Sequence, residues 1–327
     1  MTGKSDSETS RMAQGRPPPV LVLTEGSASY VDALSELKAQ GVELHAAESR
    51  SEAERLEGPF PVILGAPDRV AAFLENGRPV DWVQSTWAGV SPLLNLGRRD
   101  YLLTGVRGVF GPQVSEFVMG YLLAHELKLL ERLGCQAKKK WWSEPGDGLR
   151  DKTLAVLGTG SIGQHLAGTA AHFGLRVTGL NRSGNSTAGF HRVYPVEELE
   201  AFLGGADYLV CTLPQTPRTE SLLDETAFRA VKPGCYLVNV GRGSVIDEDA
   251  LLAALADGRL SGAVLDVFRE EPLPADHPFW HAPGVLVTAH VAAKSRPRDI
   301  ANIFIENYRR FLQGAKLAHR VDFDRGY

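Results

Sequence analysis

The sequence lacks long apolar runs, a cysteine framework and a strong excess of charge of either sign. No stretch approaches the roughly 18 consecutive apolar residues that a membrane-spanning helix needs. The formal net charge of −4 gives no electrostatic reason to expect nucleic acid or an anionic membrane as a partner. The three cysteines form no CxxC pair, and we expect buried, reduced thiols at Cys135, Cys211 and Cys235.

The amino-terminal segment lacks the apolar core of a signal peptide. Residues 1–18 are mostly polar and are interpreted as a disordered leader. Because no membrane span is found either, the sequence predicts a cytoplasmic protein.

Short apolar runs alternate with helical patterns along the whole chain of 327 residues, which is long enough for two domains with full cores. Strands alternating with helices predict parallel sheets covered on both faces. The fold class expected is therefore α/β, with two doubly wound, Rossmann-like or flavodoxin-like domains and a cleft between them. The first series of predicted strands covers 19–24, 42–47, 61–65, 82–86 and 101–106; the second covers 153–158, 176–181, 208–213, 235–241, 262–267 and 285–290.

Two long amphipathic patterns lie outside these alternating units. Residues 112–133 predict one helix between the two series, which would make a stiff connector. Residues 298–314 predict a second helix near the end of the chain.

One of the two series carries a phosphate-binding loop. Gly158, Gly160 and Gly163 stand in GxGxxG register after an apolar strand, and Ser161 and Ile162 open the helix that follows. The glycines allow a tight turn, close approach of the pyrophosphate and close helix packing, while the helix N-terminus offers unpaired N–H groups. The first turn of the other series, "LVLTEGSASY", lacks this pattern, so only the second domain is expected to bind a dinucleotide.

The tip of the next strand lacks the carboxylate that usually binds the ribose 2′-OH of NAD. Asn181, Arg182 and Ser183 stand there instead. A carboxylate would repel a 2′-phosphate, whereas arginine and serine donate hydrogen bonds to one. This pattern favours NADP(H), with NAD(H) also possible; the alternative is that Arg182 is a solvated loop charge.

Polar residues follow three further strands, at the edge where open α/β sheets bind their ligands. Arg242 lies between two glycines, Asp266 ends a strand with Glu271 beyond it, and His290 ends the last strand. Each alone has an ordinary structural explanation. Beside a nicotinamide they together supply the groups that a ketone reduction needs.

The segments "LGTGSIG", "TLPQTPRT", "NVGRGSVIDEDALLAAL", "LDVFREEPLP" and "AHVAA" resemble the D-isomer-specific 2-hydroxyacid dehydrogenase family, whose fold is of the formate/glycerate dehydrogenase type. "PLPADHPFWHAPGVLVTAHVAAKSRP" and the tail "RVDFDRGY" are most similar to its glyoxylate/hydroxypyruvate reductase branch. The resemblance covers roughly residues 60–327. It implies a substrate domain of residues 19–107 plus 296–327, a dinucleotide-binding domain of 108–295, and packing of helix 298–314 on the first domain.

The resemblance also implies roles for the residues at the strand ends. Arg242 matches the arginine that binds the substrate carboxylate and C2 oxygen, and His290 matches the proton donor. Glu271 matches its partner, which favours the imidazolium and fixes the ring. Asp266 either supports this pair, with a place near the cofactor, or is purely structural.

Other implied contacts lie in both domains. In the loop 85–90 the backbone N–H groups of Ala88, Gly89 and Val90 would hold the substrate carboxylate, and Trp87 would either wall the pocket or simply pack. Segment 212–219 would lie along the nicotinamide riboside. The cofactor-binding residues expected beyond the glycine loop and residues 181–183 are Leu213, Pro214, Thr219, Val240, Gly241 and Asp266. One departure is Ala289, where the family usually has proline.

The sequence thus predicts an NAD(P)-dependent reductase of small 2-oxoacids such as glyoxylate and hydroxypyruvate, acting as a homodimer without a metal ion. Two alternatives remain. A phosphite-type dehydrogenase would use the same residues, and a co-repressor-like protein of this fold would bind nucleotide and partners without turnover. A formate-type enzyme is disfavoured, because that branch generally has glutamine in place of Glu271.

Overall fold

The computed structural model describes residues 16–326, so most of the expected leader, residues 1–15, lies outside the described residues. The chain divides into two compact units. Unit 1 comprises Met1–Val109 and Ser295–Tyr327, and unit 2 comprises Phe110–Lys294. The sequence had placed these boundaries between 107 and 108 and between 295 and 296.

Unit 1 is built on a parallel sheet of five strands in the order β2-β1-β3-β4-β5, which is the flavodoxin-like order. β1, β3 and β4 are buried along their whole length, as expected for a sheet covered on both faces. Each strand predicted in this part is present, but shorter at its ends. The strands are β1 (Val20–Leu23), β2 (Leu44–Ala47), β3 (Val62–Gly65), β4 (Trp82–Ser85) and β5 (Leu102–Thr104).

The last helix of the chain, α13 (Pro297–Leu312), completes unit 1. Phe304 stacks on the fully buried Trp82 of β4 with ring centroids 5.0 Å apart, and the Tyr308 hydroxyl donates to the Pro18 carbonyl at 2.6 Å. The prediction that this helix packs on the first sheet is therefore confirmed. The other helices of the unit are α2 (Ser27–Ala33), α3 (Ser35–Ala39), α4 (Arg50–Arg55), α5 (Pro67–Leu74) and α6 (Ser91–Asn95).

Unit 2 is built on a parallel sheet of seven strands in the order β12-β11-β10-β9-β6-β7-β8. Numbered within the unit this is 3-2-1-4-5-6-7, the Rossmann order with one further strand, and its switch point lies between β6 and β9. The strands are β6 (Thr153–Leu157), β7 (Arg176–Asn181), β8 (Arg192–Pro195), β9 (Tyr208–Cys211), β10 (Cys235–Asn239), β11 (Leu260–Leu265) and β12 (Val285–Val287).

The sequence analysis missed β8. This edge strand is short, is nowhere fully buried and ends in proline, so it has neither the apolar run nor the alternation by which strands are recognised.

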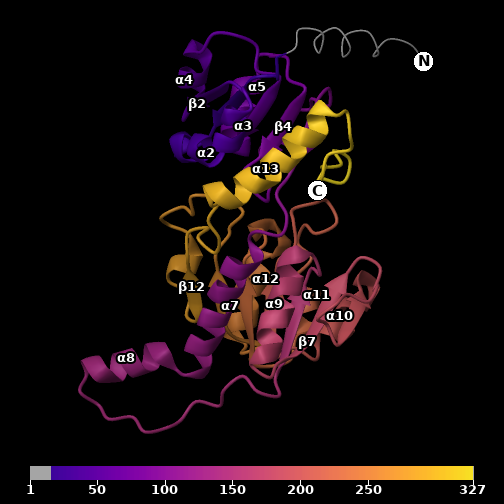
Figure 1. Ribbon diagram of the computed structural model, residues 1–327. Coiled ribbons are helices and arrows are strands. Elements are labelled where there is room, and N and C mark those ends of the chain that lie inside the picture. Colours follow the sequence, from indigo (N-terminus) through magenta and orange to yellow (C-terminus); the bar gives the residue numbers. More distant parts are fainter. Residues whose placement is uncertain (1–15, 327) are drawn as a thin grey trace. The chain divides into compact units, whose positions relative to one another are not determined.

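The helices of unit 2 cover both faces of its sheet (Figure 1). They are α7 (Gly111–Glu126), α8 (Leu129–Ala137), α9 (Ser161–His172), α10 (Leu199–Leu203), α11 (Glu225–Ala230) and α12 (Glu248–Ala256), with 3-10 turns η2 (Val196–Glu198), η3 (Gly243–Val245) and η4 (Pro278–Trp280).

The single connector helix predicted over 112–133 is wrong. The helix breaks after Leu127, where Lys128 adopts the left-handed conformation with φ of 52°, and α8 then leaves the body of the unit (Figure 1). The last residue of α7, Glu126, is buried and accepts hydrogen bonds from Tyr208 and Lys152, which anchors the helix end to the sheet. Beyond that anchor, α8 has no buried residue, so nothing in unit 2 holds a continuation of α7.

Two smaller expectations are tested here. Cys211 and Cys235 are buried, but Cys135 lies on α8 and is partly exposed, so the expectation of three buried thiols is wrong for Cys135. Across residues 16–326, we find no helix with the length and apolar character that crossing a membrane requires.

Candidate functional site

The turn between β6 and α9 forms a cradle of backbone. Gly158 has φ of 104°, and a Cβ there would lie 2.8 Å from Thr212 Oγ1. A Cβ on Gly163 would lie 2.1 Å from the Gly158 carbonyl oxygen, so both positions require glycine. A Cβ on Gly160 would meet open space, and within the described part of the chain α9 has no side-chain cap. The exposed first turn of α9 can therefore receive an anion such as a dinucleotide pyrophosphate.

The loop after β7 is folded around Asn181. Its Nδ2 donates to Thr159 Oγ1 at 3.0 Å and to the Asn185 carbonyl at 3.1 Å, while its Oδ1 accepts from the Ser183 N–H at 3.1 Å. Asn181 is thus engaged in shaping the loop and tying it to the glycine turn. Arg182 is exposed and enters no ion pair with any residue of 16–326, so it and the exposed Ser183 are available to a ligand. Thr159, which sequence reasoning missed, is the link between the two loops.

Close backbone contacts fix the loop after β10. A Cβ on Gly241 would lie 2.7 Å from the Leu213 carbonyl oxygen, and one on Gly243 would lie 2.0 Å from the Phe268 carbonyl carbon. Asn239, buried at the end of β10, accepts from the Gly241 N–H and donates to the Arg242 carbonyl, both at 3.1 Å. Arg242 therefore stands on a loop clamped from both sides, and Asn239 is a second contributor that the sequence analysis missed.

The segment after β9 is closed on itself next to this loop. Thr219 Oγ1 donates to the Pro214 carbonyl at 2.7 Å and accepts from the Thr216 N–H at 2.9 Å. The Val240 N–H donates to the Cys211 carbonyl at 3.1 Å, which joins the ends of β9 and β10. The residues expected to bind the cofactor thus come together at the carboxyl edge of the sheet, on both sides of the switch point.

Arg242 is half-buried, and its Nη1 donates to the Gly241 carbonyl. Burial lowers the pKa of the guanidinium, and the nearby Glu271 carboxylate acts in the opposite direction. An arginine remains cationic at neutral pH even so. A partly buried guanidinium is suited to holding an anionic substrate group.

Glu271 and His290 form a pair beside this arginine. His290 Nδ1 lies 2.8 Å from Glu271 Oε2, and Glu271 Oε1 accepts from the Phe268 N–H at 2.9 Å. The carboxylate is thus fixed at one oxygen and orients the imidazole with the other. The His290 side chain is 51% exposed, and its Nε2 has no hydrogen-bond partner among residues 16–326. This nitrogen is free to exchange a proton with a ligand.

Asp266 frames the loop that carries His290. It is 1% exposed; Oδ1 accepts from the Val291 N–H and Thr288 Oγ1, and Oδ2 accepts from the Ala292 N–H. The Asp266 carbonyl also accepts from the His290 N–H at 2.7 Å. His290 has φ of 54°, which is uncommon outside glycine, and these bonds hold it there. Of its two expected roles, the contacts favour support of the Glu271–His290 pair, while contact with the cofactor stays a prediction.

The predicted substrate loop lies in unit 1, after β4. Ser85 Oγ accepts from the Trp87 N–H at 2.9 Å and donates to the Trp87 carbonyl at 2.8 Å, which turns the chain. Trp87 and Ala88 are exposed, Gly89 is intermediate and Val90 is buried. No hydrogen bond within residues 16–326 uses the N–H groups of residues 88–90, so they are available to an anion. The geometry suits the predicted role without testing it.

Comparison with known proteins gives consistent matches. Residues 119–292 match the family model described as D-isomer specific 2-hydroxyacid dehydrogenase, NAD binding domain. A glyoxylate/hydroxypyruvate reductase A from Serratia proteamaculans is 34% identical over 273 residues, covering 84% of this chain and 82% of the relative.

Solved structures of this family resemble the chain over nearly its whole length. A D-isomer specific 2-hydroxyacid dehydrogenase family protein from Aeromonas salmonicida is 44% identical with a TM-score of 0.89, covering 94% of this chain and 99% of that one. An NADPH-dependent glyoxylate/hydroxypyruvate reductase from Sinorhizobium meliloti, solved with NADP and sulfate, is 31% identical with a TM-score of 0.83, covering 95% and 100%. The chain belongs to the D-isomer specific 2-hydroxyacid dehydrogenase family, a family of NAD(P)-dependent oxidoreductases, and resembles its glyoxylate/hydroxypyruvate reductase members.

Proposed function

We propose that this protein reduces small 2-oxoacids, with glyoxylate and hydroxypyruvate as the expected substrates, to 2-hydroxyacids with NADPH. The observation that carries the proposal is the Glu271–His290 pair beside the half-buried Arg242, at the same sheet edge as the glycine cradle. Relatives that are glyoxylate/hydroxypyruvate reductases support the choice of substrate class.

The residues divide the chemistry between binding and proton transfer. When bound, the nicotinamide supplies a hydride to the carbonyl carbon of the substrate. Arg242 binds the carboxylate and the C2 oxygen and stabilises negative charge as it develops there. His290 gives the proton on Nε2 to that oxygen, and Glu271 orients the ring through Nδ1. The reverse transfer returns the proton to the same nitrogen.

A second anion-binding element is proposed in unit 1. The free N–H groups of Ala88, Gly89 and Val90 are suited to bind the substrate carboxylate, and the exposed Trp87 to limit substrate size. Trp87→Ala removes the indole and should therefore improve activity on phenylpyruvate relative to glyoxylate.

Arg182 carries the proposed preference for NADPH over NADH. It is exposed, unpaired within the described part of the chain, and next to a loop that Asn181 ties to the glycine turn. A charge-assisted hydrogen bond contributes about 1.5–3 kcal/mol, so Arg182→Ala should raise KM for NADPH by roughly tenfold or more and leave KM for NADH unchanged. Arg192→Ala, on the edge strand β8 and paired with Glu198, is the matched control. Equal use of both cofactors by the unaltered protein would contradict this part of the proposal.

The reaction itself is tested with a panel of glyoxylate, hydroxypyruvate, pyruvate and phenylpyruvate, each run with NADPH and NADH. We expect turnover of glyoxylate and hydroxypyruvate at roughly tens per second, which is a typical enzymatic rate. His290→Ala and Arg242→Ala should abolish it. Full turnover in either variant would overturn the mechanism. Reduction of NADP by phosphite would instead identify a phosphite-type dehydrogenase. Nucleotide binding without turnover of any substrate would favour a co-repressor-like protein.

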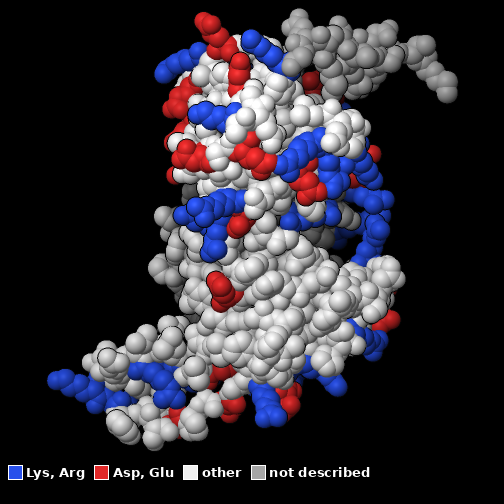
Figure 2. Space-filling view, in the orientation of Figure 1, with Lys and Arg blue, Asp and Glu red and all other residues white. Residues whose placement is uncertain are grey.

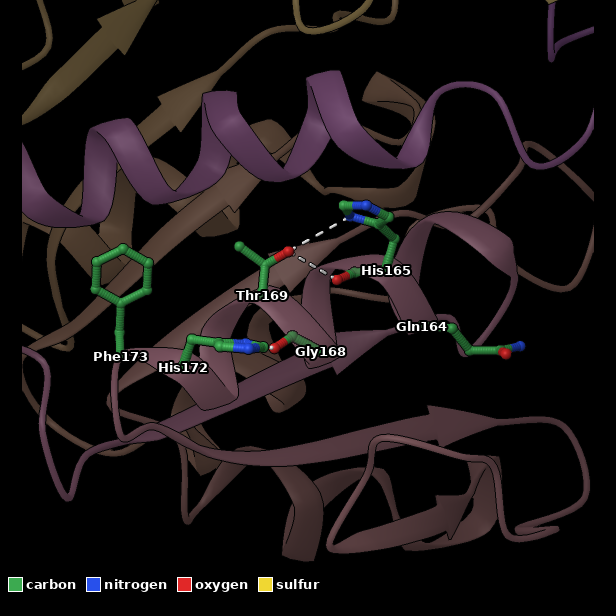
Figure 3. A pocket seen from close by; sticks show the side chains of 6 residues that line it. All are labelled: Gln164, His165, Gly168, Thr169, His172 and Phe173. Carbon is green, nitrogen blue, oxygen red and sulfur yellow. Dashed lines mark hydrogen bonds between the residues drawn. The ribbon is translucent and has the colours of Figure 1, made fainter.

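We further propose that two copies of the chain associate through unit 2. The exposed side chains of Leu127, Leu129, Leu130 and Leu133 gather around α8, and Trp141 in the loop after it is 92% exposed. The face that carries α7 and α9 shows few charged side chains (Figure 2). A shallow groove on α9, below α7, is lined by Gln164, His165, Gly168, Thr169, His172 and Phe173 (Figure 3). Apolar exposure on this scale favours a protein interface.

A cytoplasmic location stays a prediction from the sequence.

A further inference from the structure

Arg269 makes more hydrogen bonds than its place in the sequence suggests. It follows β11 and stands two residues before Glu271. Its Nη1 lies 2.6 Å from Glu220 Oε1, and its Nη2 lies 2.8 Å from Ser221 Oγ. Nη2 also donates to the carbonyls of Ser244 at 3.1 Å and Ile246 at 2.8 Å, and Nε donates to Ile246 at 3.2 Å. A single guanidinium thus meets four residues.

These partners belong to two different loops, and Arg269 lies in a third. Glu220 and Ser221 lie in the loop after β9, Ser244 and Ile246 lie in the loop after β10, and Arg269 itself lies after β11. The first two loops also bond to each other, since the Ser221 N–H donates to the Ser244 carbonyl at 2.8 Å. Ser221 has φ of 47°, a conformation that needs support from its surroundings. The guanidinium therefore joins three neighbouring strand ends at the carboxyl edge of the sheet.

The same three loops carry the residues of the proposed reaction. Arg242 and Gly243 open the loop after β10, and Gly243 lies directly on the backbone of Phe268 and Arg269. The Phe268 N–H in turn fixes one oxygen of Glu271, whose other oxygen orients His290. A shift of the loop after β10 against the Phe268–Arg269 backbone would change the separation between Arg242 and the Glu271–His290 pair.

We propose that Arg269 is a positioning residue: its guanidinium holds the loops after β9, β10 and β11 together and so keeps Arg242 aligned with the Glu271–His290 pair. This inference rests on the proposed function. Only arginine suits the place, because its planar fork presents five donors at once, whereas the lysine ammonium sits at a single point and cannot reach four acceptor residues on two loops. Arg269 itself is not proposed to touch substrate or cofactor.

Arg269→Met and Arg269→Lys test the proposal, with Arg259→Met as the matched control. Arg259 also donates to backbone carbonyls, at Arg229 (2.7 Å) and Val231 (3.5 Å), but it lies before β11, at the opposite edge of the sheet. Both methionine variants should lower Tm, because each loses bonds to the backbone. Misplacement by about 1 Å costs on the order of a hundredfold in rate, so Arg269→Met should lower kcat by tenfold to a hundredfold, and Arg259→Met should leave kcat unchanged.

Three further readouts separate positioning from stability alone. In Arg269→Met the KM for the 2-oxoacid should rise, because Arg242 is no longer aligned with the Glu271–His290 pair; in Arg259→Met it should not. Arg269→Lys keeps a cation opposite Glu220 but loses most of the hydrogen bonds to the loop after β10, so kcat should stay low in this variant as well. Amide hydrogen exchange at 216–223 and 242–246 should be faster in Arg269→Met only.

The outcomes distinguish this inference from the proposed function. If the unaltered protein turns over 2-oxoacids and Arg269→Met loses no more kcat than Arg259→Met, Arg269 is not a positioning residue. Exchange at 216–223 and 242–246 that is unchanged in Arg269→Met would overturn the inference as well. If the unaltered protein shows no turnover on any substrate of the panel, the proposed function fails first, and with it the role given to Arg269.

Discussion

At the level of single side chains, the charge on Glu271 determines how His290 can act. Glu271→Gln keeps the size of the side chain but removes the charge, and a glutamine has one oxygen to serve both the Phe268 N–H and the imidazole. The imidazole then loses its charge-assisted hydrogen bond and is held less firmly in one orientation. We expect a lower kcat for the reduction of glyoxylate and hydroxypyruvate, because the proton donor is no longer fixed by its partner. An unchanged kcat in Glu271→Gln would contradict the role given to this pair.

The thiols provide a test of burial that is independent of the reaction. Burial raises the pKa of both Cys211 and Cys235 to about 12, so neither forms appreciable thiolate at pH 8. Cys135 is partly exposed on α8. Iodoacetamide at pH 8 should therefore modify Cys135 alone in the folded protein, as read by mass spectrometry of peptides, and all three after denaturation. Modification of Cys211 under native conditions would show that the core of unit 2 opens more readily than its packing implies.

At the level of elements, Asp266 shows how one side chain shapes a catalytic loop. Its carboxylate serves three donors, and an asparagine offers only one oxygen. Asp266→Asn therefore leaves a buried donor unpaired, at about 1–3 kcal/mol, and loosens the loop 288–292 that carries His290.

We expect Asp266→Asn to lower both Tm and kcat. The control is Asp247→Ala, which removes a side-chain cap of α12, since Asp247 accepts from the Ala250 N–H at 2.9 Å. Loss of such a cap costs about 1 kcal/mol of stability, with no expected effect on kcat. Equal kcat in the two variants would mean that the loop 288–292 keeps His290 in place without Asp266.

Most elements could be predicted because their cause is local. Parallel strands buried on both faces are continuous apolar runs, so the strands around β6 and β10 stand out in the sequence. The break after Leu127 could not be predicted from the sequence, because the amphipathic pattern of the helix continues past it. The break depends on where Glu126 meets Tyr208, a residue 82 positions later. The edge strand β8 was missed for the opposite reason, since it has little apolar character of its own.

The candidate site shows the same division. The residue types at 242, 271 and 290 are visible in the sequence because each follows a strand. The supports of these residues, namely Asn239, Asp266 and Arg269, act through contacts with loops that are distant in sequence. An asparagine at the end of a strand or an arginine in a loop has many possible partners, and only the folded chain selects among them.

At the level of the whole molecule, the chain uses two parallel sheets for different purposes. In unit 2, the turn after the first strand has glycine at Gly158 and Gly163, where any Cβ would collide with backbone or side chain. The first turn of unit 1 has one glycine, Gly26, with open space around it and a buried Ser27 after it. The two units share a layered architecture, but only unit 2 has the close-packed turn that a pyrophosphate requires.

The exposed leucines around α8 in unit 2 predict how two copies of the chain assemble. Full burial of a leucine contributes about 1.5–3 kcal/mol, so the leucines around α8 are a strong driving force for pairing of two copies. A glutamate placed in such an interface would have to lose its hydration without a partner. Leu130→Glu/Leu133→Glu should therefore convert a dimer to a monomer in sedimentation velocity experiments. Leu312→Glu, an exposed leucine at the end of α13 in unit 1, should leave the mass unchanged. If the unaltered protein sediments as a monomer at micromolar concentration, the leucines of α8 face solvent or a different partner; if the double variant remains dimeric, the copies associate through another surface.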